Sequence, residues 1–423
     1  MRRLSQGTVA LFLGLWAAAG CEPPPVAAPE PIPPLAPEPP VEVPPADAKA
    51  VVEGGNAFAL DLYKTLAAKP GNVVCSPYSV SAALAMTYAG ARGETAAEMA
   101  KVLGFTTLGE RVHPSQADLA HRLKGDPAKG QPEFHVANAL WGQRGVPFMP
   151  EFLALTRTHY GAGLREVDYI GDTEGARRTI NGWVGEQTKG KIPELILAGM
   201  LTESTRLTLT NAIYFKGSWL HEFPIKDTVD DKFRVTATET VPTRMMHARI
   251  QGWCYEGDGV KAVWLPYQGG GKSMLIVVPD EIEGLGAVEG MLTAEQLKRW
   301  RDGRESTDVK LQLPKFKATF KSLLGETLRG MGMPLAFDGV RADFSGIVQS
   351  SGWFIKDVIH EAVVEVDEQG TVAAAATAVV MNAPISMPRR RRIITVRADR
   401  PFLYLIVDDA TQAIMFVGRV AKP

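Results

Sequence analysis

A segment of 18 residues near the C-terminus contains no charged side chain, and it constrains the fold more than any other part of the sequence. Residues 371–388 read TVAAAATAVVMNAPISMP and lie between Gly370 and the arginines at 389–392. The alanine run favours a buried helix, but the β-branched residues after it favour a strand. One face of such a strand would bury Thr371, Ala373, Ala375, Thr377, Val379 and Met381 without charge or bulk. Left as a loop, this segment is an unused strand, an aggregation hazard that makes sense if its insertion is the function.

The first 46 residues are expected to lie outside the folded domain. Residues 1–21 have two arginines, a short apolar core and small residues before Cys21, which is the pattern of a secretory signal. The last four of them resemble the lipobox of bacterial lipoproteins, in which the cysteine carries lipid and becomes the first residue. A plain secreted protein is the alternative. Residues 22–46 hold 12 of the 30 prolines, which predicts an extended linker. We therefore expect an exported, membrane-anchored chain whose folded domain covers 47–423.

The composition is that of an ordinary globular protein. The 46 Lys and Arg residues nearly balance the 47 Asp and Glu residues, which excludes a strongly basic nucleic-acid-binding protein. Beyond the N-terminus, no uninterrupted apolar run is long enough for a membrane span. Cys75 and Cys254 invite a disulfide in an exported protein, but both lie in apolar stretches, so we favour two buried thiols. Seven scattered histidines indicate no metal site.

Hydrophobic periodicity predicts one large α+β domain with antiparallel sheets. Ser76 before Pro77 predicts a capped helix that runs to about residue 89, and Thr293 with Gln296 predicts one that runs to about residue 300. Further helices are expected at 93–103, 150–160, 173–188 and 321–332. Strands are expected at 206–210, 273–278, 310–313, 362–366, 402–407 and 413–420, the last two as a hairpin.

No conventional catalytic motif is complete. The sequence lacks the Gly-x-Ser-x-Gly elbow of the α/β-hydrolases. His360 and Glu361 match half of a zinc-protease motif, but Val364 stands where the second histidine belongs. Residues 271–273 resemble the end of a phosphate-binding loop, but Pro266 replaces its first glycine, and a hairpin explains them better. The motifs therefore give no indication of an enzyme.

Several short motifs resemble those of the serpins, the superfamily of serine protease inhibitors, and they occur in the same order. The resemblance spans about residues 50–423, and its motifs lie at 72–79, 181–184, 188–192, 211–219, 342–346, 400–402 and 416–420. The most characteristic is NAIYFKGSW at 211–219. Together they identify the chain as a member of this family. The resemblance implies the serpin fold, with large mixed and antiparallel sheets, surrounding helices and an exposed reactive-centre loop.

The resemblance also implies an inhibitor that acts as a suicide substrate. A protease cleaves the loop and forms an acyl-enzyme, and the cut loop then inserts as a new strand into the main sheet, which distorts the linked protease. The catalytic residues belong to the protease, so the chain would be no enzyme and would need no cofactor. Its expected partners are a target protease and, through lipid at Cys21, a membrane, with no nucleic acid, and we expect a monomer. The alternative is a non-inhibitory serpin that serves as a surface binding or structural module.

The residues at the base of the loop suit an inhibitor, because the hinge that must insert is small. The hinge comprises Glu368, Gly370, Thr371, Ala373, Ala374, Ala375 and Ala376. Val372 stands where many relatives have Glu, but alternation places it on the outer face of the inserted strand. The resemblance further implies a polar cluster beneath the opening sheet, called the shutter, made of Ser76, Ser79, Asn211 and His360. Trp219 matches the tryptophan of the region called the breach, and Lys315 with Glu368 matches a salt bridge at the base of the loop.

The scissile bond has three candidates. Family spacing from the hinge glycine places it at Pro384–Ile385, but proline before the cut suits few serine proteases. The local sequence at 383–388 resembles the cleavage region of a family member and favours Ile385–Ser386, one residue later. An apolar Ile385 suits elastase- or subtilisin-like proteases. The arginines at 389–392 offer trypsin-like sites, but they lie five or more residues beyond the distance from the hinge glycine that the family spacing predicts. The alternative interpretation is a solvated run of charges that ends the apolar segment.

Overall fold

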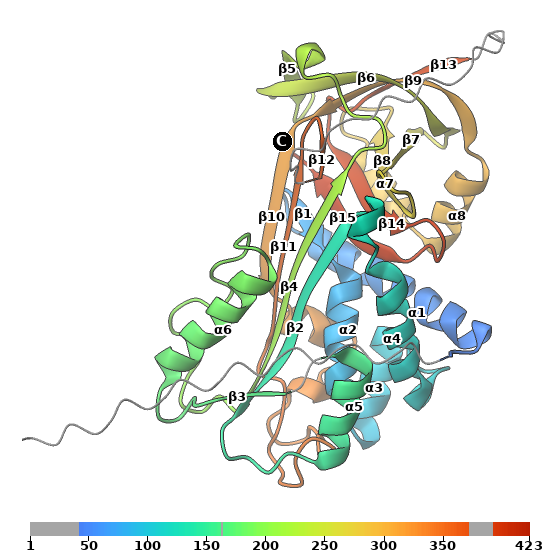
Figure 1. The fold of residues 1–423 in the computed structure, drawn as a ribbon. Helices are drawn as coiled ribbons and strands as arrows, with labels where there is room; N and C mark the ends of the chain where they lie inside the picture. Colours follow the sequence, from blue (N-terminus) through green and yellow to red (C-terminus); the bar gives the residue numbers. More distant parts are fainter. Residues whose placement is uncertain (1–41, 162–163, 372–391) are drawn as a thin grey trace, which may run out of the picture. The chain divides into compact units, whose positions relative to one another are not determined.

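The computed structural model describes residues 42–161, 164–371 and 392–423, in which two β-sheets are packed with helices (Figure 1). The helices are α1 (Pro45–Ala67), α2 (Pro77–Tyr88), α3 (Gly93–Leu103), α4 (Val112–Leu123), α5 (Pro150–Tyr160), α6 (Thr173–Gln187), α7 (Leu285–Met291), α8 (Ala294–Asp302) and α9 (Gly325–Met331). Helix α1 begins two residues before the predicted start of the domain, with Pro45 in its first turn, where a missing N–H costs nothing.

The smaller sheet contains the feature that matters most for function. Its strands are β2 (Glu133–Gln143), β3 (Arg165–Val167), β4 (Leu207–Ser218), β10 (Phe316–Leu323), β11 (Val358–Val366) and β12 (Gly370–Thr371), in the order β10-β11-β12-β4-β2-β3. Strands β11 and β4 also pair directly and in parallel, from Val358 with Leu209 to Val363 with Tyr214. The two-residue β12 lies between them at one end only. We call the boundary between β11 and β4 the seam.

The larger sheet contributes more residues to the main core than the smaller one does. Its strands are β1 (Val73–Cys75), β5 (Val229–Arg234), β6 (Thr240–Gly257), β7 (Val260–Pro266), β8 (Lys272–Pro279), β9 (Glu305–Pro314), β13 (Ile393–Arg397), β14 (Phe402–Asp408) and β15 (Ile414–Val420). Their order is β1-β15-β14-β8-β7-β6-β9-β13, and β5 pairs with β6. Strand β8 is buried along its whole length, as a strand covered on both faces must be.

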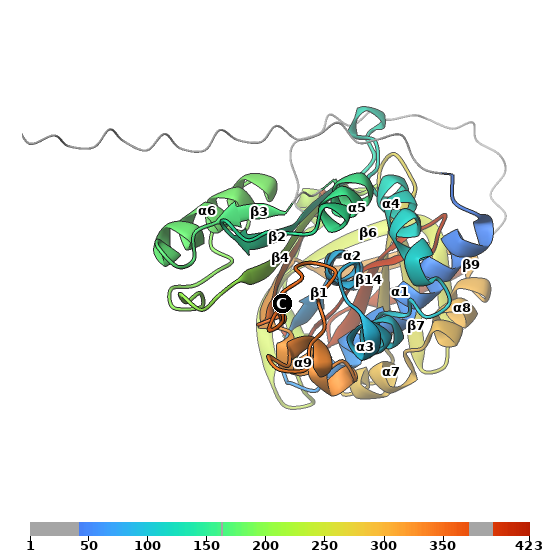
Figure 2. The same cartoon turned by 90° about the horizontal axis from the view of Figure 1, so that it is seen from below.

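The two faces of the smaller sheet are covered differently. Helix α6 lies on one face, which we call the outer face, and the remaining helices lie away from it (Figures 1 and 2). Under α6 a separate apolar cluster joins α6 and the segment after it to β2, β4 and β11, through residues such as Val184, Ile192, Ala139, Ala212 and Val363. The inner face contributes to the main core. Any strand added at the seam must therefore fit between two packed layers.

Most predicted elements are confirmed, with one clear error. Ser76 caps α2 by accepting from the backbone N–H of Ser79, and Thr293 caps α8 in the same way. Strands β14 and β15 form the predicted hairpin. The helix predicted at 321–332 is wrong over its first part, because β10 continues to Leu323 and α9 covers only Gly325–Met331. Pairing of β10 with β11 along its full length overrides a local helical pattern.

Candidate functional site

The four residues expected to form the shutter meet across the seam, although they come from α2, β4 and β11. Asn211 and His360 are register partners in the parallel pair. The Asn211 amide donates to Ser79 Oγ at 2.6 Å, and the Ser76 backbone N–H donates to His360 Nε2 at 3.2 Å. Ser76 Oγ donates to the Met415 carbonyl at 2.7 Å. This network ties the start of α2 to both strands that flank the seam.

His360 is neutral in this environment. Its side chain is fully buried, and Nε2 accepts a hydrogen bond while Nδ1 faces Asn211 Oδ1. This arrangement requires the proton on Nδ1. Burial lowers the pKa of His360 to about 3, since the charged form loses its hydration. The cluster is therefore built from uncharged polar groups that satisfy one another.

At the other end of the seam, Gly370 and Thr371 already lie between the two strands. Gly370 pairs with Ser218 and Thr371 with Gly217 on β4, and Thr371 also pairs with Val366 on β11. A Cβ atom at position 370 would overlap the carbonyl oxygen of Gly217, so glycine is required for this approach. Thr371 is fully buried, and its hydroxyl shares a 2.7 Å hydrogen bond with Tyr267. Strand β12 is thus a two-residue strand between β11 and β4 at this end of the seam.

Trp219 fixes the turn that delivers β12. Its backbone N–H donates to the Gln369 carbonyl at 2.8 Å, and its indole N–H donates to the Asp367 carbonyl at 3.0 Å. The indole stacks on Tyr267 with ring centroids 4.7 Å apart. Offset aromatic stacking of this kind adds to area burial. Trp219 therefore holds both the turn and the ring that receives Thr371.

Glu368 lies in the same turn and is held by two donors. Lys315 Nζ lies 2.6 Å from its Oε2, and the Thr228 hydroxyl donates to Oε1 at 2.9 Å. Burial alone would raise the pKa of Glu368, but the bonds from Lys315 and Thr228 lower it overall. The carboxylate is therefore charged at neutral pH, and it anchors the base of the loop.

Three further residues of the site were not predicted. Asn138 on β2 accepts from the Asn211 amide at 2.6 Å and donates to the Ser79 carbonyl at 3.0 Å. Tyr267 and Thr228 bond Thr371 and Glu368, as described above. These residues belong to other strands or loops, and no spacing in the sequence relates them to the hinge. Asn138, a polar residue inside the apolar run from Val136 to Trp141, is the one signal in the sequence.

The structure tests some of the remaining predictions and leaves others outside the described residues. Cys75 and Cys254 are free, buried thiols, as predicted. Among the described residues, His, Cys, Asp and Glu side chains form no group of three that could bind a metal, and no helix there has the length and apolarity to cross a bilayer. Ala373 to Ala376, the bonds Pro384–Ile385 and Ile385–Ser386, the arginines at 389–391 and Cys21 lie outside the described residues. Arg392 is described, and its exposed side chain forms an ion pair with Glu256.

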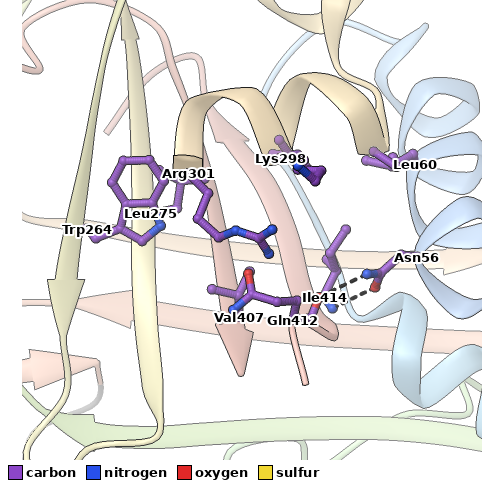
Figure 3. A pocket seen from close by; sticks show the side chains of 11 residues that line it. Asn56, Leu60, Trp264, Leu275, Lys298, Arg301, Val407, Gln412 and Ile414 are labelled. Atoms are coloured by element: carbon purple, nitrogen blue, oxygen red, sulfur yellow. Dashed lines mark hydrogen bonds between the residues drawn. The ribbon is translucent and has the colours of Figure 1, made fainter. Parts of the chain in front are cut away.

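Two surface cavities lie apart from this site. The one in Figure 3 has a volume of about 90 Å³ and is lined by Leu60 on α1, Lys298 on α8 and Gln412 before β15. A second, of about 390 Å³, adjoins Trp253 and Arg304. None of the predicted site residues lines either cavity. The seam is therefore the candidate functional site.

Comparison with known proteins agrees with this arrangement. The sequence model of the family described as Serpin (serine protease inhibitor) matches residues 53–423. The chain belongs to the serpin family. It is 38% identical over 385 residues to "Leukocyte elastase inhibitor A" of Rattus norvegicus and 40% identical over 378 residues to "Leukocyte elastase inhibitor" of Bos taurus, in each case over 86% of this chain and 97% of the relative.

Solved serpin structures share the fold. Uncleaved ovalbumin superposes with a TM-score of 0.79 at 29% identity, over 88% of this chain and all of the other. The serpin fold predicted from the sequence is thus confirmed. In this serpin β11 and β4 pair directly from Val358 to Val363, and β12 lies between them at one end.

Proposed function

We propose that this serpin inhibits a serine protease as a suicide substrate, by inserting its cleaved loop along the seam. The observation that carries the proposal is β12. Thr371 pairs antiparallel with both β11 and β4, and Gly370 pairs antiparallel with β4. Further along the seam β11 and β4 pair with each other in parallel. Insertion would replace one parallel pairing by two antiparallel pairings, which are slightly more stable per residue. The energy for distorting a linked protease would come from this exchange.

The residues that follow Thr371 suit the space they would enter. In the register set by Gly370 and Thr371, odd-numbered residues would face inward, and those up to 377 are Ala, Ala and Thr. Thr377 would come opposite both His360 and Asn211, which are partners now. Adding a strand would move His360 and Asn211 apart by about 4.8 Å. The Thr377 hydroxyl would then lie between them and could form hydrogen bonds with both side chains. Alanines add no bulk to a packed layer.

Proposed specificity rests on the loop sequence and on the relatives. We place the cut at Ile385–Ser386, with Pro384–Ile385 as the alternative and the arginines at 389–392 as a third choice. An apolar Ile385 fits the pocket of an elastase-like protease. The relatives' names, leukocyte elastase inhibitors, support the same class of target. The chain would supply a substrate bond and a moving strand, and no catalytic group.

The test mixes the purified chain with pancreatic elastase, subtilisin and trypsin, followed by denaturing gels and mass analysis of the released C-terminal peptide. We expect an SDS-stable complex with elastase or subtilisin and a peptide that begins at Ser386. A peptide that begins within 390–393, from a trypsin complex, would keep the mechanism and move the bond. Cleavage by every protease without any complex would reject inhibition and favour the non-inhibitory binding module.

We also propose that the chain is exported as a bacterial-type lipoprotein, with lipid on Cys21 and a proline-rich linker. The support is the N-terminal sequence alone. Expression in a bacterial host with labelled palmitate should label the chain and place it in the membrane fraction. Cys21→Ser should abolish the label, while Cys75→Ser, which removes a buried thiol, should keep it. Release of an unlabelled wild-type chain would indicate plain secretion.

A further inference from the structure

The segment after α6 crosses the seam on its outer face and is bound by charge on both sides. On one side Lys189 Nζ lies 2.5 Å from Glu133 on β2. On the other side Lys191 Nζ lies 3.8 Å from Glu365 on β11. Gly190 lies between the two lysines with φ of 75°, after Lys189 with φ of 51°. A tight turn thus carries two cations that point to opposite sides of the seam.

These ion pairs lie where strand insertion would proceed. Continuing the register of Gly370 and Thr371 by one residue brings position 372 opposite Lys216 on β4 and Glu365 on β11. Lys216 Nζ lies 3.7 Å from Glu133, so Glu133 binds lysines from both β4 and the crossing turn. Position 372 carries valine, which cannot replace either charged partner. The next residue to enter must therefore pass beneath the turn without offering a new ion pair.

Insertion moves the two anchoring carboxylates apart. Glu133 stays with β4, its register partner being Lys216, whereas Glu365 stays with β11. A strand placed between β4 and β11 adds about 4.8 Å to their separation. The turn follows α6, and Arg165 on β3 stacks on Trp183 of α6 at 5.0 Å, which keeps the turn on the Glu133 side. Lys191 would then lose Glu365, while Lys189 would keep Glu133.

We propose that the Lys191–Glu365 ion pair is a strap across the seam that slows loop insertion and makes its rate depend on ionic strength. This inference rests on the proposed function. A second contact also links the segment after α6 to the β11 side of the seam, since Lys321 on β10 donates to the Glu194 carbonyl at 2.7 Å. The Lys191 and Glu365 side chains are each about two-fifths exposed, 38% and 39%, so salt reaches them. The Lys189–Glu133 pair is shorter but lies on one side of the seam, so it does not act as a strap.

The experiment compares the full-length chain with Lys191→Gln, Glu365→Gln and the matched control Lys189→Gln. Elastase is added at NaCl concentrations from about 20 to about 300 mM, and the ratio of SDS-stable complex to cleaved product is measured. Faster insertion raises this ratio. For the first two variants we expect a ratio about two- to fivefold above wild type at low salt, with little further change as salt increases. Lys189→Gln should retain the wild-type salt dependence.

A second readout separates failure of this inference from failure of the proposed function. A synthetic peptide with the sequence of residues 372–384, which begins after the position that Thr371 already occupies, is added to the uncleaved chain, and its uptake is followed by native mass spectrometry. Uptake should be about two- to fivefold faster in Lys191→Gln and Glu365→Gln. Equal rates in these variants and in wild type, or an equal gain in Lys189→Gln, would overturn the strap. Absence of any elastase complex, wild type included, would reject the inhibitor, and the peptide rates would still decide the strap.

Discussion

At the scale of single residues, His360 couples the stability of the native state to pH. It is buried and neutral, with a pKa of about 3 against 6.5 for a solvated histidine. The unfolded chain therefore binds a proton that the native chain does not. The stabilisation is complete above pH 6.5 and is lost as the pH falls toward 3. His113, buried with a pKa of about 4, acts in the same direction.

The free energy of unfolding should therefore fall on mild acidification. From pH 7 to pH 5, His360 alone should lower it by about 2 kcal/mol. Urea denaturation at pH 7 and at pH 5 measures this loss in wild type and in His360→Gln. The variant should lose about 2 kcal/mol less unfolding free energy than wild type between the two pH values, because only the His113 contribution remains. Replacement of the exposed His121 on α4 serves as the control. If His360→Gln shows the same pH dependence of unfolding free energy as wild type, His360 is not buried in its neutral form.

Thr371 tests the hinge directly. Thr371→Arg places a cation against Tyr267 in a fully buried position, where an unpaired charge is very costly. We expect cleavage by elastase to continue while the SDS-stable complex falls by at least about tenfold, which corresponds to about 1.4 kcal/mol in the partition. Thr371→Ser is the matched control, because it keeps the hydroxyl that bonds Tyr267 and adds no charge. Normal trapping by Thr371→Arg would contradict insertion along the seam.

At the scale of elements, the turn between β11 and β12 depends on Lys315. Lys315 is the donor that keeps the mostly buried Glu368 charged. In Lys315→Ala the carboxylate keeps Thr228 but loses its cation, and we expect the free energy of unfolding to fall by about 1–3 kcal/mol. Lys317→Ala, on the exposed face of β10, should change it by less than about 0.5 kcal/mol. Urea denaturation of both variants checks the difference, and equal effects would mean that the ion pair contributes nothing.

At the scale of the whole molecule, the linker should be dispensable for inhibition. Deleting residues 22–42 leaves α1 intact, since it begins at Pro45. We expect the rate of elastase inhibition in solution to stay within about twofold of wild type, because a linker only sets reach. Deleting 22–50 would also remove Asp47, whose Oδ1 lies 2.5 Å from Arg111, and should lower the melting temperature. Slower inhibition by the shorter deletion would assign the linker a role in the folded domain.

Prediction from sequence succeeded where a short stretch of chain decides its own conformation. The cap at Ser76 and the hairpin at β14 and β15 depend on neighbours within a few positions. The helix predicted at 321–332 was wrong because β11, some 40 residues further along the chain, pairs with β10 and extends it to Leu323. Asn138 and Tyr267 were missed because their roles depend on partners more than 50 residues away.

The sequence by itself determined that the chain has an uncharged segment able to become a strand, and that the chain is a serpin. Only the tertiary structure decided that the seam is closed below Thr371, that β12 already occupies its first two positions, and that Lys191 crosses it to Glu365. The reason is physical. Propensity, alternation and capping act between residues close in the chain, whereas strand order and ion pairing across a seam are fixed by which distant segments pack together.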